Sequence, residues 1–186
     1  ELKACLDSLV GQNYDSYEII YVDSSTDNLG DIARDYTRKV FHTAARGANH
    51  ARNLGASEAE GSMLVFMNGN DRLEETAAAD INDAANKGQK LGTLSWGTRK
   101  LGFKDFISDM ILNLPTYKAW PALFVDKDIF HSVGGFNEDG KIDINDLAHF
   151  GETLRDTYVA SRLTSQVYAD KTQFHKYGYL RRVIQW

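Results

Sequence analysis

Cysteine and long apolar runs are scarce in this sequence, and basic residues are outnumbered by acidic ones. Cys5 is the single cysteine among 186 residues, so an internal disulfide is excluded and a reducing compartment such as the cytoplasm is expected. No apolar run approaches the roughly 18 residues that a membrane span requires, and no signal peptide pattern is found. The formal net charge of −5 argues against nucleic acid as a partner, because phosphate binding favours basic surfaces. Neither a G-x-G-x-x-G loop nor a Walker-type loop occurs, which disfavours an unrelated doubly wound nucleotide-binding domain.

The rest of the composition is typical of a soluble globular protein. Hydrophobic residues make up 42% of the chain and charged residues 25%, and the length suffices for a sizeable core. No internal repeat, low-complexity tract or linker divides the chain, so we expect one domain over residues 1–186. Cys5 shares a helical face with Leu2, Leu6 and Leu9, which predicts a thiol packed in the core.

Short strands alternate with helices over the first half of the chain, and this alternation predicts an α/β fold with a mostly parallel, mixed sheet flanked by helices. The expected helices are 1–10, 29–36, 49–61 and 74–87, and the expected strands are 17–23, 39–42, 62–67 and 91–96. The second half is less regular. Its expected elements are a strand at 120–125, a short helix at 126–133, a glycine-rich turn at 134–141 and a helix at 144–156.

Three loops follow the first three expected strands, at the edge where open parallel α/β sheets bind ligands. Together with the helix after the second loop they supply carboxylate, hydroxyl, amide and guanidinium groups: Asp23, Ser25, Asp27, Arg46, Arg52, Asn53, Asn68, Asn70 and Asp71. Such groups suit a nucleotide with its diphosphate and metal. Structural alternatives stay open, since Asp23 and Asp27 can cap the next helix and Arg52 can be a solvated helix residue.

Other polar and aromatic residues favour structural roles. No metal-ligand spacing is found among His42, His50, His131 and His149, and a structural role is favoured for His175 over contact with a diphosphate. Trp96 and Trp120 can stack on a sugar ring, but packing in the core is favoured for both. The terminal segment 173–186 mixes aromatic and basic residues, and a packed terminal helix is favoured there over a peripheral membrane contact.

The order and spacing of the loops carry more information than any one of them. The segments "LKACLDSLVGQNYDSYEIIYVDSSTDN", "ARGANHARNLGASEAEGSMLVFMNGND" and "VGGFNED" together resemble the family 2 glycosyltransferases, which have the nucleotide-sugar-binding fold called GT-A. The resemblance covers about residues 1–150 and is most specific at "ARNLGASEAEGSMLVFMNGND". It implies a nucleotide-sugar-binding half over about residues 1–95, and an acceptor half with a C-terminal tail over about 96–186.

The resemblance also implies roles on the donor side of the site. Asp23 matches an aspartate that contacts the donor base, with Ser25 and Asp27 in the same loop. Arg52 and Asn53 match the helix that borders the donor pocket, and Arg46 lies in the loop before it.

The metal motif and the catalytic base also follow from the resemblance. Asn68 and Asn70 fall on the two aspartates of an Asp-x-Asp metal motif, and Asp71 on the acidic residue that often follows. The base that deprotonates the acceptor hydroxyl is assigned first to Asp143 and second to Asp146.

Two departures from the family pattern modify these expectations. The strand that family members place before the first helix is absent from this sequence, and the metal motif has amides for carboxylates. Because amides bring no charge, we expect a divalent cation, Mn²⁺ or Mg²⁺, to bind weakly and with help from the diphosphate. The expected function is inverting transfer of a sugar from a nucleotide donor to a sugar or lipid-linked acceptor, in polysaccharide or glycoconjugate biosynthesis, in the cytoplasm or at the inner membrane face. The alternative is a catalytically impaired domain that serves in binding or assembly.

Overall fold

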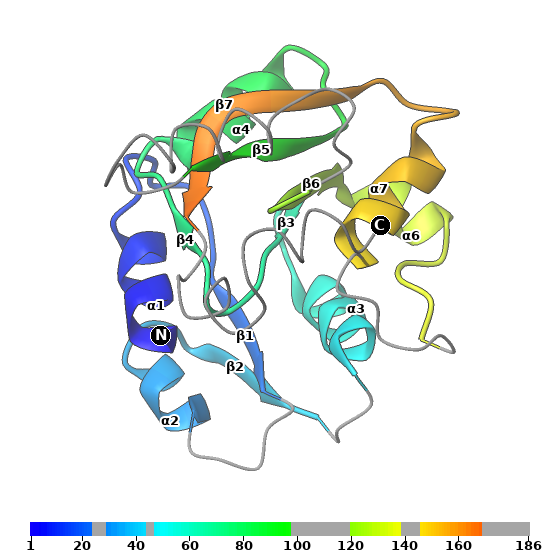
Figure 1. Cartoon of the computed structure of the whole chain (residues 1–186). Helices are drawn as coiled ribbons and strands as arrows, with labels where there is room; N and C mark the ends of the chain where they lie inside the picture. Colours follow the sequence, from blue (N-terminus) through cyan, green and yellow to red (C-terminus); the bar gives the residue numbers. More distant parts are fainter. Residues whose placement is uncertain (24–28, 44–46, 98–119, 139–145, 169–186) are drawn as a thin grey trace, which may run out of the picture.

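The computed structural model describes residues 1–23, 29–43, 47–97, 120–138 and 146–168. Its helices are α1 (Leu2–Val10), α2 (Leu29–Arg34), α3 (Ala48–Glu58), α4 (Ala77–Asn86), α6 (Lys127–Ser132) and α7 (Asp146–Leu154). Its strands are β1 (Ile20–Asp23), β2 (Lys39–His42), β3 (Met63–Phe66), β4 (Arg72–Leu73), β5 (Leu91–Gly97), β6 (Leu123–Asp126) and β7 (Ala160–Tyr168). Figure 1 shows their arrangement. None of these helices is long and apolar enough to cross a membrane.

The described strands form two hydrogen-bonded sheets. The parallel pair β1–β2 makes the smaller one, and the larger has the order β3-β6-β5-β7-β4. In the larger sheet only β5 and β7 pair in parallel, whereas β3–β6, β5–β6 and β4–β7 are antiparallel. The predicted mixed sheet is present, but the predicted excess of parallel pairs is not. The strand–helix alternation on which that prediction rested extends only through the first strands, and β6 runs antiparallel to both of its neighbours.

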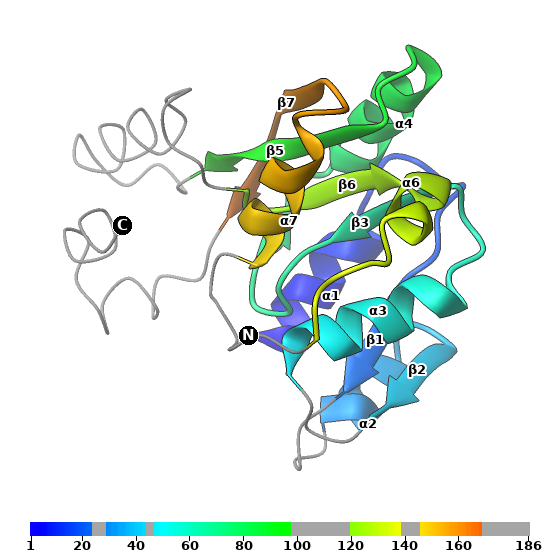
Figure 2. The ribbon, with the colours of Figure 1, turned by 90° about the vertical axis from the view of Figure 1, so that its right-hand side faces the viewer.

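Helices cover both faces of the larger sheet (Figure 2). Each face has its own apolar cluster. One cluster joins α3, α6 and α7 to the sheet, and the other joins α4 and α1 to the opposite face. Neighbouring residues of β6 alternate between them, with Leu123 and Val125 in the first cluster and Phe124 in the second. This alternation follows from the two-residue period of a strand. Trp120 and Cys5 are buried, as predicted.

Several element boundaries differ from the predicted ones. The predicted strand 17–23 begins only at Ile20. The predicted helix 49–61 ends at Glu58, because Ala59 is extended with φ −74° and ψ 137°. The predicted helix 29–36 ends at Arg34, and the apolar face expected there is incomplete because Ile32 is 39% exposed.

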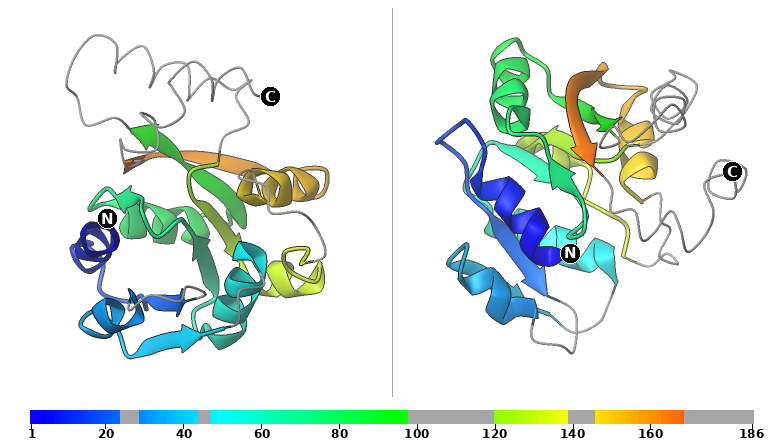
Figure 3. Two further views of the ribbon diagram at one scale, coloured as in Figure 1. Left: turned by 60° about the horizontal axis from the view of Figure 1, so that its bottom comes forward. Right: turned by 60° about the vertical axis from the view of Figure 1, so that its left-hand side comes forward.

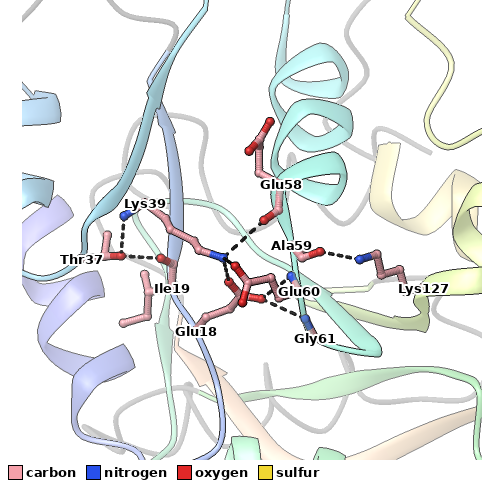
Figure 4. A network of polar contacts seen from close by, with 9 residues as sticks. All are labelled: Glu18, Ile19, Thr37, Lys39, Glu58, Ala59, Glu60, Gly61 and Lys127. Atoms are coloured by element: carbon pink, nitrogen blue, oxygen red, sulfur yellow. Dashed lines mark hydrogen bonds and ion pairs between the residues drawn. The ribbon is translucent and has the colours of Figure 1, made fainter.

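A polar network joins the smaller sheet to the turn between α3 and β3 (Figure 4). Lys39 at the start of β2 places Nζ 2.6 Å from Glu18 Oε2 and 2.7 Å from Glu60 Oε1. The other carboxylate oxygen of Glu18 accepts from the backbone N–H groups of Glu60 and Gly61, at 2.6 and 3.0 Å. The network therefore holds the beginnings of β1 and β2 against the chain that leads into β3.

Candidate functional site

The turn after β3, residues 68–71, is the segment in which the sequence predicted a metal site. The backbone N–H of Asp71 donates to the carbonyl oxygen of Asn68 at 3.1 Å, which closes the turn. The Asn68 side chain donates from Nδ2 to Asp71 Oδ2 at 3.0 Å. Asp71 is buried at 3% exposure, whereas Asn68 is exposed and Asn70 is half-buried. The buried Asp71 carboxylate is thus held by the side-chain amide of Asn68.

Arg52 reaches this turn from α3. Its Nη2 donates to Asn68 Oδ1 at 3.3 Å, and its Nη1 donates to Asn49 Oδ1 at 3.0 Å. Its guanidinium carbon also lies 5.5 Å from the centroid of the Phe136 ring, within the range of a cation–π contact. These contacts fix the guanidinium beside the turn, so Arg52 is more than a solvated helix residue.

Asn53, on the same helix, holds the glycine-rich turn after α6. Its Nδ2 donates to Phe136 O at 2.8 Å and to Glu138 Oε1 at 2.7 Å, and its Oδ1 accepts from Phe136 N at 2.8 Å. The turn itself requires glycine, since Gly134 and Gly135 have φ of +84° and +73°. Asn53 therefore connects α3, which the resemblance places beside the donor, to the segment that the resemblance places on the acceptor side.

Two further α3 residues contact the same segment, and the sequence analysis did not single them out. Asn49 Nδ2 donates to Asn137 O at 2.9 Å, and His50 Nδ1 lies 2.8 Å from Glu138 Oε2. With Arg52 and Asn53 they follow the spacing i, i+1, i+3, i+4, which places side chains on one side of a helix. The sequence signal for these contacts was the grouping of polar residues in "NHARN".

Asp23 ends β1 and is buried at 6% exposure. Its Oδ2 accepts from the backbone N–H of Gly30 at 3.2 Å, so it has the capping role that was one of its two alternatives. A cavity of about 210 Å³ adjoins it, lined also by α2 and β2 residues. A larger hollow of about 450 Å³ lies at the opposite ends of β1 and β2, lined among others by Gln12, Tyr14 and Tyr17.

The thiol of Cys5 lies behind the metal-motif turn. Its Sγ is 4.0 Å from the backbone oxygen of Asn68. Burial, and then the negative charge of Asp71, raises the pKa of this thiol to about 12. The thiol therefore stays protonated and packs in the core, as predicted.

The remaining predicted site residues are only partly covered by the structure. Ser25, Asp27, Arg46 and Asp143 lie outside the described residues, and Asp146 begins α7. Within the described ranges, no three His, Cys, Asp or Glu side chains are grouped so as to hold a metal ion. The structure thus brings together Arg52, Asn68 and Asp71, and it joins Asn53 to the neighbouring glycine turn.

Comparisons with known sequences match parts of the chain. The family model described as glycosyl transferase family 2 matches residues 1–129. The uncharacterized glycosyltransferase EpsJ of Bacillus subtilis (strain 168) is 33% identical over 94 residues, which are 47% of this chain and 27% of that protein. The uncharacterized glycosyltransferase YibD of Escherichia coli (strain K12) is 34% identical over 82 residues, 41% of this chain and 24% of that protein. These matches span about a quarter of each relative.

Solved structures match nearly the whole chain. Residues 1–349 of TarS from S. aureus superpose with a TM-score of 0.70 at 18% identity, covering 98% of this chain and 60% of that one. The same protein in complex with UDP-GlcNAc gives a TM-score of 0.69 at 18% identity, covering 90% and 54%. Mannosyltransferase PcManGT from Pyrobaculum calidifontis, in complex with GDP-Man and Mn²⁺, gives a TM-score of 0.66 at 17% identity, covering 88% of this chain and 50% of that one. At these identities the likeness shows the fold, which is GT-A as predicted.

Proposed function

Because the chain belongs to glycosyltransferase family 2, we propose that it transfers a sugar from a nucleoside-diphosphate donor to an acceptor hydroxyl, with inversion at the anomeric carbon. The observation that carries the proposal is the contact of Arg52 with Asn68, which sets a guanidinium beside the turn after β3. A guanidinium is well suited to a diphosphate, because its planar set of donors matches phosphate oxygens. The TarS complex with UDP-GlcNAc supports a nucleotide-sugar donor by analogy of fold.

We assign the donor to residues up to about 95 and the acceptor to the rest of the chain. Asp23, with Ser25 and Asp27, faces the donor base in this proposal, and Arg46 and Arg52 face its diphosphate. The cavity that Asp23 helps to line supports the first assignment. A sugar or lipid-linked acceptor and a cytoplasmic location remain predictions from the sequence.

The reaction is a single displacement. A carboxylate, Asp143 first and Asp146 second, accepts the proton of the acceptor hydroxyl. The acceptor oxygen forms a bond to the anomeric carbon as the bond from that carbon to the phosphate oxygen breaks, and the nucleoside diphosphate leaves with the electron pair. Arg52 stabilises the charge that develops on this leaving group.

The residues of the metal-motif turn do not fit a divalent cation as they stand. Hard cations prefer charged oxygen ligands, and the carboxylate here, Asp71, is buried and hydrogen-bonded to Asn68. The amide oxygen of Asn68 accepts from the positively charged Arg52. No step of the proposed reaction therefore depends on a metal.

A donor panel tests the proposed function. The chain is incubated with UDP-, GDP- and dTDP-sugars and a set of sugar and lipid-linked acceptors, and mass spectrometry follows nucleoside diphosphate and glycosylated product. Turnover with one donor class is expected, and Asp143→Asn and Asp146→Asn are compared to identify the base. Donor binding without turnover across the panel would support the catalytically impaired alternative, and no donor binding would contradict both.

A further inference from the structure

At the turn after β3, the side-chain amide of Asn68 links a positive group, the Arg52 guanidinium of α3, to a negative group, the Asp71 carboxylate. Asn68 Oδ1 accepts from the Arg52 guanidinium at 3.3 Å, and Asn68 Nδ2 donates to the Asp71 carboxylate at 3.0 Å. The amide orientation follows from chemistry, because the oxygen must face the donor and the nitrogen must face the acceptor. A positive and a negative group are thus both satisfied in the turn by residues of the chain itself.

This arrangement explains the amide at position 68. A carboxylate there would put an oxygen in place of Nδ2, which lies 3.0 Å from Asp71 Oδ2. Two carboxylates at that distance cannot both stay ionised without a proton or a cation between them. With asparagine, the Asp71 carboxylate stays buried at 3% exposure and bonded to an N–H donor.

The same arrangement disfavours a cation at Asn68. A cation that coordinated the Asn68 amide oxygen would lie next to the guanidinium that donates to this oxygen, and the two positive charges would repel each other. The guanidinium is also held by Asn49 Oδ1 and by the face of Phe136, so its position is set by more than the Asn68 contact.

We infer that Arg52 replaces a divalent cation at the donor diphosphate, so that this chain binds its nucleotide without a metal. The inference rests on the proposed function, because it concerns the diphosphate of the same donor. Arg52 supplies a fixed positive charge, Asp71 and Asn68 hold that charge at the turn, and the diphosphate binds next to it. Asn68 is a positioning residue in this arrangement.

Isothermal titration with UDP, GDP and dTDP, in EDTA and in Mn²⁺, tests the inference. We expect the wild-type dissociation constant for the nucleotide that binds to agree within about twofold between the two conditions, because no metal contributes charge. Arg52→Met is expected to weaken binding by about tenfold or more in both conditions, the loss typical of a charge-assisted hydrogen bond. Arg52→Lys keeps the charge and is expected to recover part of this loss.

Asn68→Asp provides a sensitive second arm. It places a carboxylate against Asp71, so we expect it to bind Mn²⁺ alone more tightly than the wild type, as measured by electron paramagnetic resonance. Its UDP or GDP affinity is expected to fall in EDTA and to recover in Mn²⁺.

Arg38→Met is the matched control for Arg52→Met, since Arg38 is exposed and lies before β2, away from the turn.

The outcomes separate the inference from the proposed function. Wild-type binding that strengthens about tenfold or more in Mn²⁺ would overturn the inference and leave the proposed function standing. Unchanged affinity in Arg52→Met would overturn the role of Arg52. A loss of affinity supports this role when the thermal unfolding of the variant matches that of the wild type. Failure of UDP, GDP and dTDP to bind under every condition would overturn the proposed function together with the inference.

Discussion

Asn53 connects α3 to the glycine-rich turn after α6 through a single side chain. It makes two hydrogen bonds to the backbone of Phe136 and a third to Glu138, and all three span more than 80 residues of sequence. The sequence placed Asn53 on the helix next to the donor. The structure adds that its amide orders the turn across from that helix.

Replacement of Asn53 by alanine is expected to destabilise the protein. It removes three hydrogen bonds and leaves the Phe136 N–H and carbonyl without these partners, so the free energy of unfolding should fall by about 2–3 kcal/mol. Urea denaturation followed by circular dichroism measures the change. Asn86→Ala, at an exposed position at the end of α4, is the control and should change it by no more than about 0.5 kcal/mol. Equal effects of the two substitutions would contradict the role given to Asn53.

Residue types at the site were more predictable than their partners. The sequence singled out Asp23, Asn68 and Asp71 as candidates because polar residues after apolar strands are recognisable locally. Arg52 was a candidate because it lies on the helix after the second loop. Their contacts depend on which strand and helix lie side by side, as with Arg52 and Asn68, which are 16 residues apart on different elements. Such contacts are set by packing, and local periodicity does not contain them.

At the scale of elements, the turn between α6 and residue 138 joins the candidate site to the core. Phe136 of this turn is buried and packs against Phe66 of β3 and Phe130 of α6, with ring centroids 5.0 and 5.5 Å apart. The ring also faces Arg52. The turn therefore contributes, with Asn49 and Asn68, to the position of the Arg52 guanidinium.

The two glycines of this turn make a matched pair for mutation. Gly134 has φ +84° with open space at the Cβ position, so Gly134→Ala should cost only the backbone strain of about 1–2 kcal/mol. Gly135 has φ +73°, and a Cβ there would lie 2.7 Å from Asn53 Oδ1. Gly135→Ala should therefore cost about 1–3 kcal/mol more than Gly134→Ala. Chemical denaturation of both variants measures the difference, and equal losses would argue against the close Asn53 contact.

The elements that the sequence missed have weak local patterns. β4 is two residues long, and β7 consists largely of polar residues with Ser165 and Val167 as its buried positions. Neither strand shows the apolar run or clear alternation by which strands are recognised. The helices α1, α3 and α4 were predicted because their patterns extend over several turns.

At the scale of the whole molecule, two separate sheets have to be held together. Figure 3 shows β1 and β2 beside α2, apart from the larger sheet. Glu18 contributes to the connection through Lys39 and through the backbone of Glu60 and Gly61. Burial acts to raise the pKa of the Glu18 carboxyl, but hydrogen bonds from Lys39 and the two N–H groups outweigh it and leave the pKa below its usual value of 4.5.

Glu18→Gln should weaken this connection in a pH-dependent way. Because folding lowers the pKa of Glu18, its ionised form stabilises the protein fully above about pH 4.5, and this stabilisation is lost as the pH falls through the folded-state value. The thermal unfolding temperature of the wild type should therefore exceed that of the variant at pH 7, and the two temperatures should converge under acidic conditions. Glu60→Gln is the control, since Glu60 is 84% exposed and its ion pair is expected to contribute little. A difference in unfolding temperature between wild type and Glu18→Gln that widened as the pH fell would contradict the stabilising role of ionised Glu18.

The fold class and family followed from the sequence, whereas the pairing of the strands did not. Alternating strands and helices up to β5 indicated the α/β class, and the resemblance of three segments in their order and spacing indicated GT-A and family 2. Pairing between β5 and β7 joins residues about 70 apart, and no local pattern specifies such a contact.

The most direct test of the account is to locate nucleotide binding on the molecule. The ¹⁵N-labelled chain is titrated with UDP, GDP and dTDP, and amide chemical shifts are followed by nuclear magnetic resonance. We predict that one nucleotide shifts the amides around Asp23, Arg52 and Asn68 together, with a single dissociation constant. Shifts confined to the hollow lined by Gln12, Tyr14 and Tyr17, or no shifts with any nucleotide, would contradict a donor site at the turn after β3.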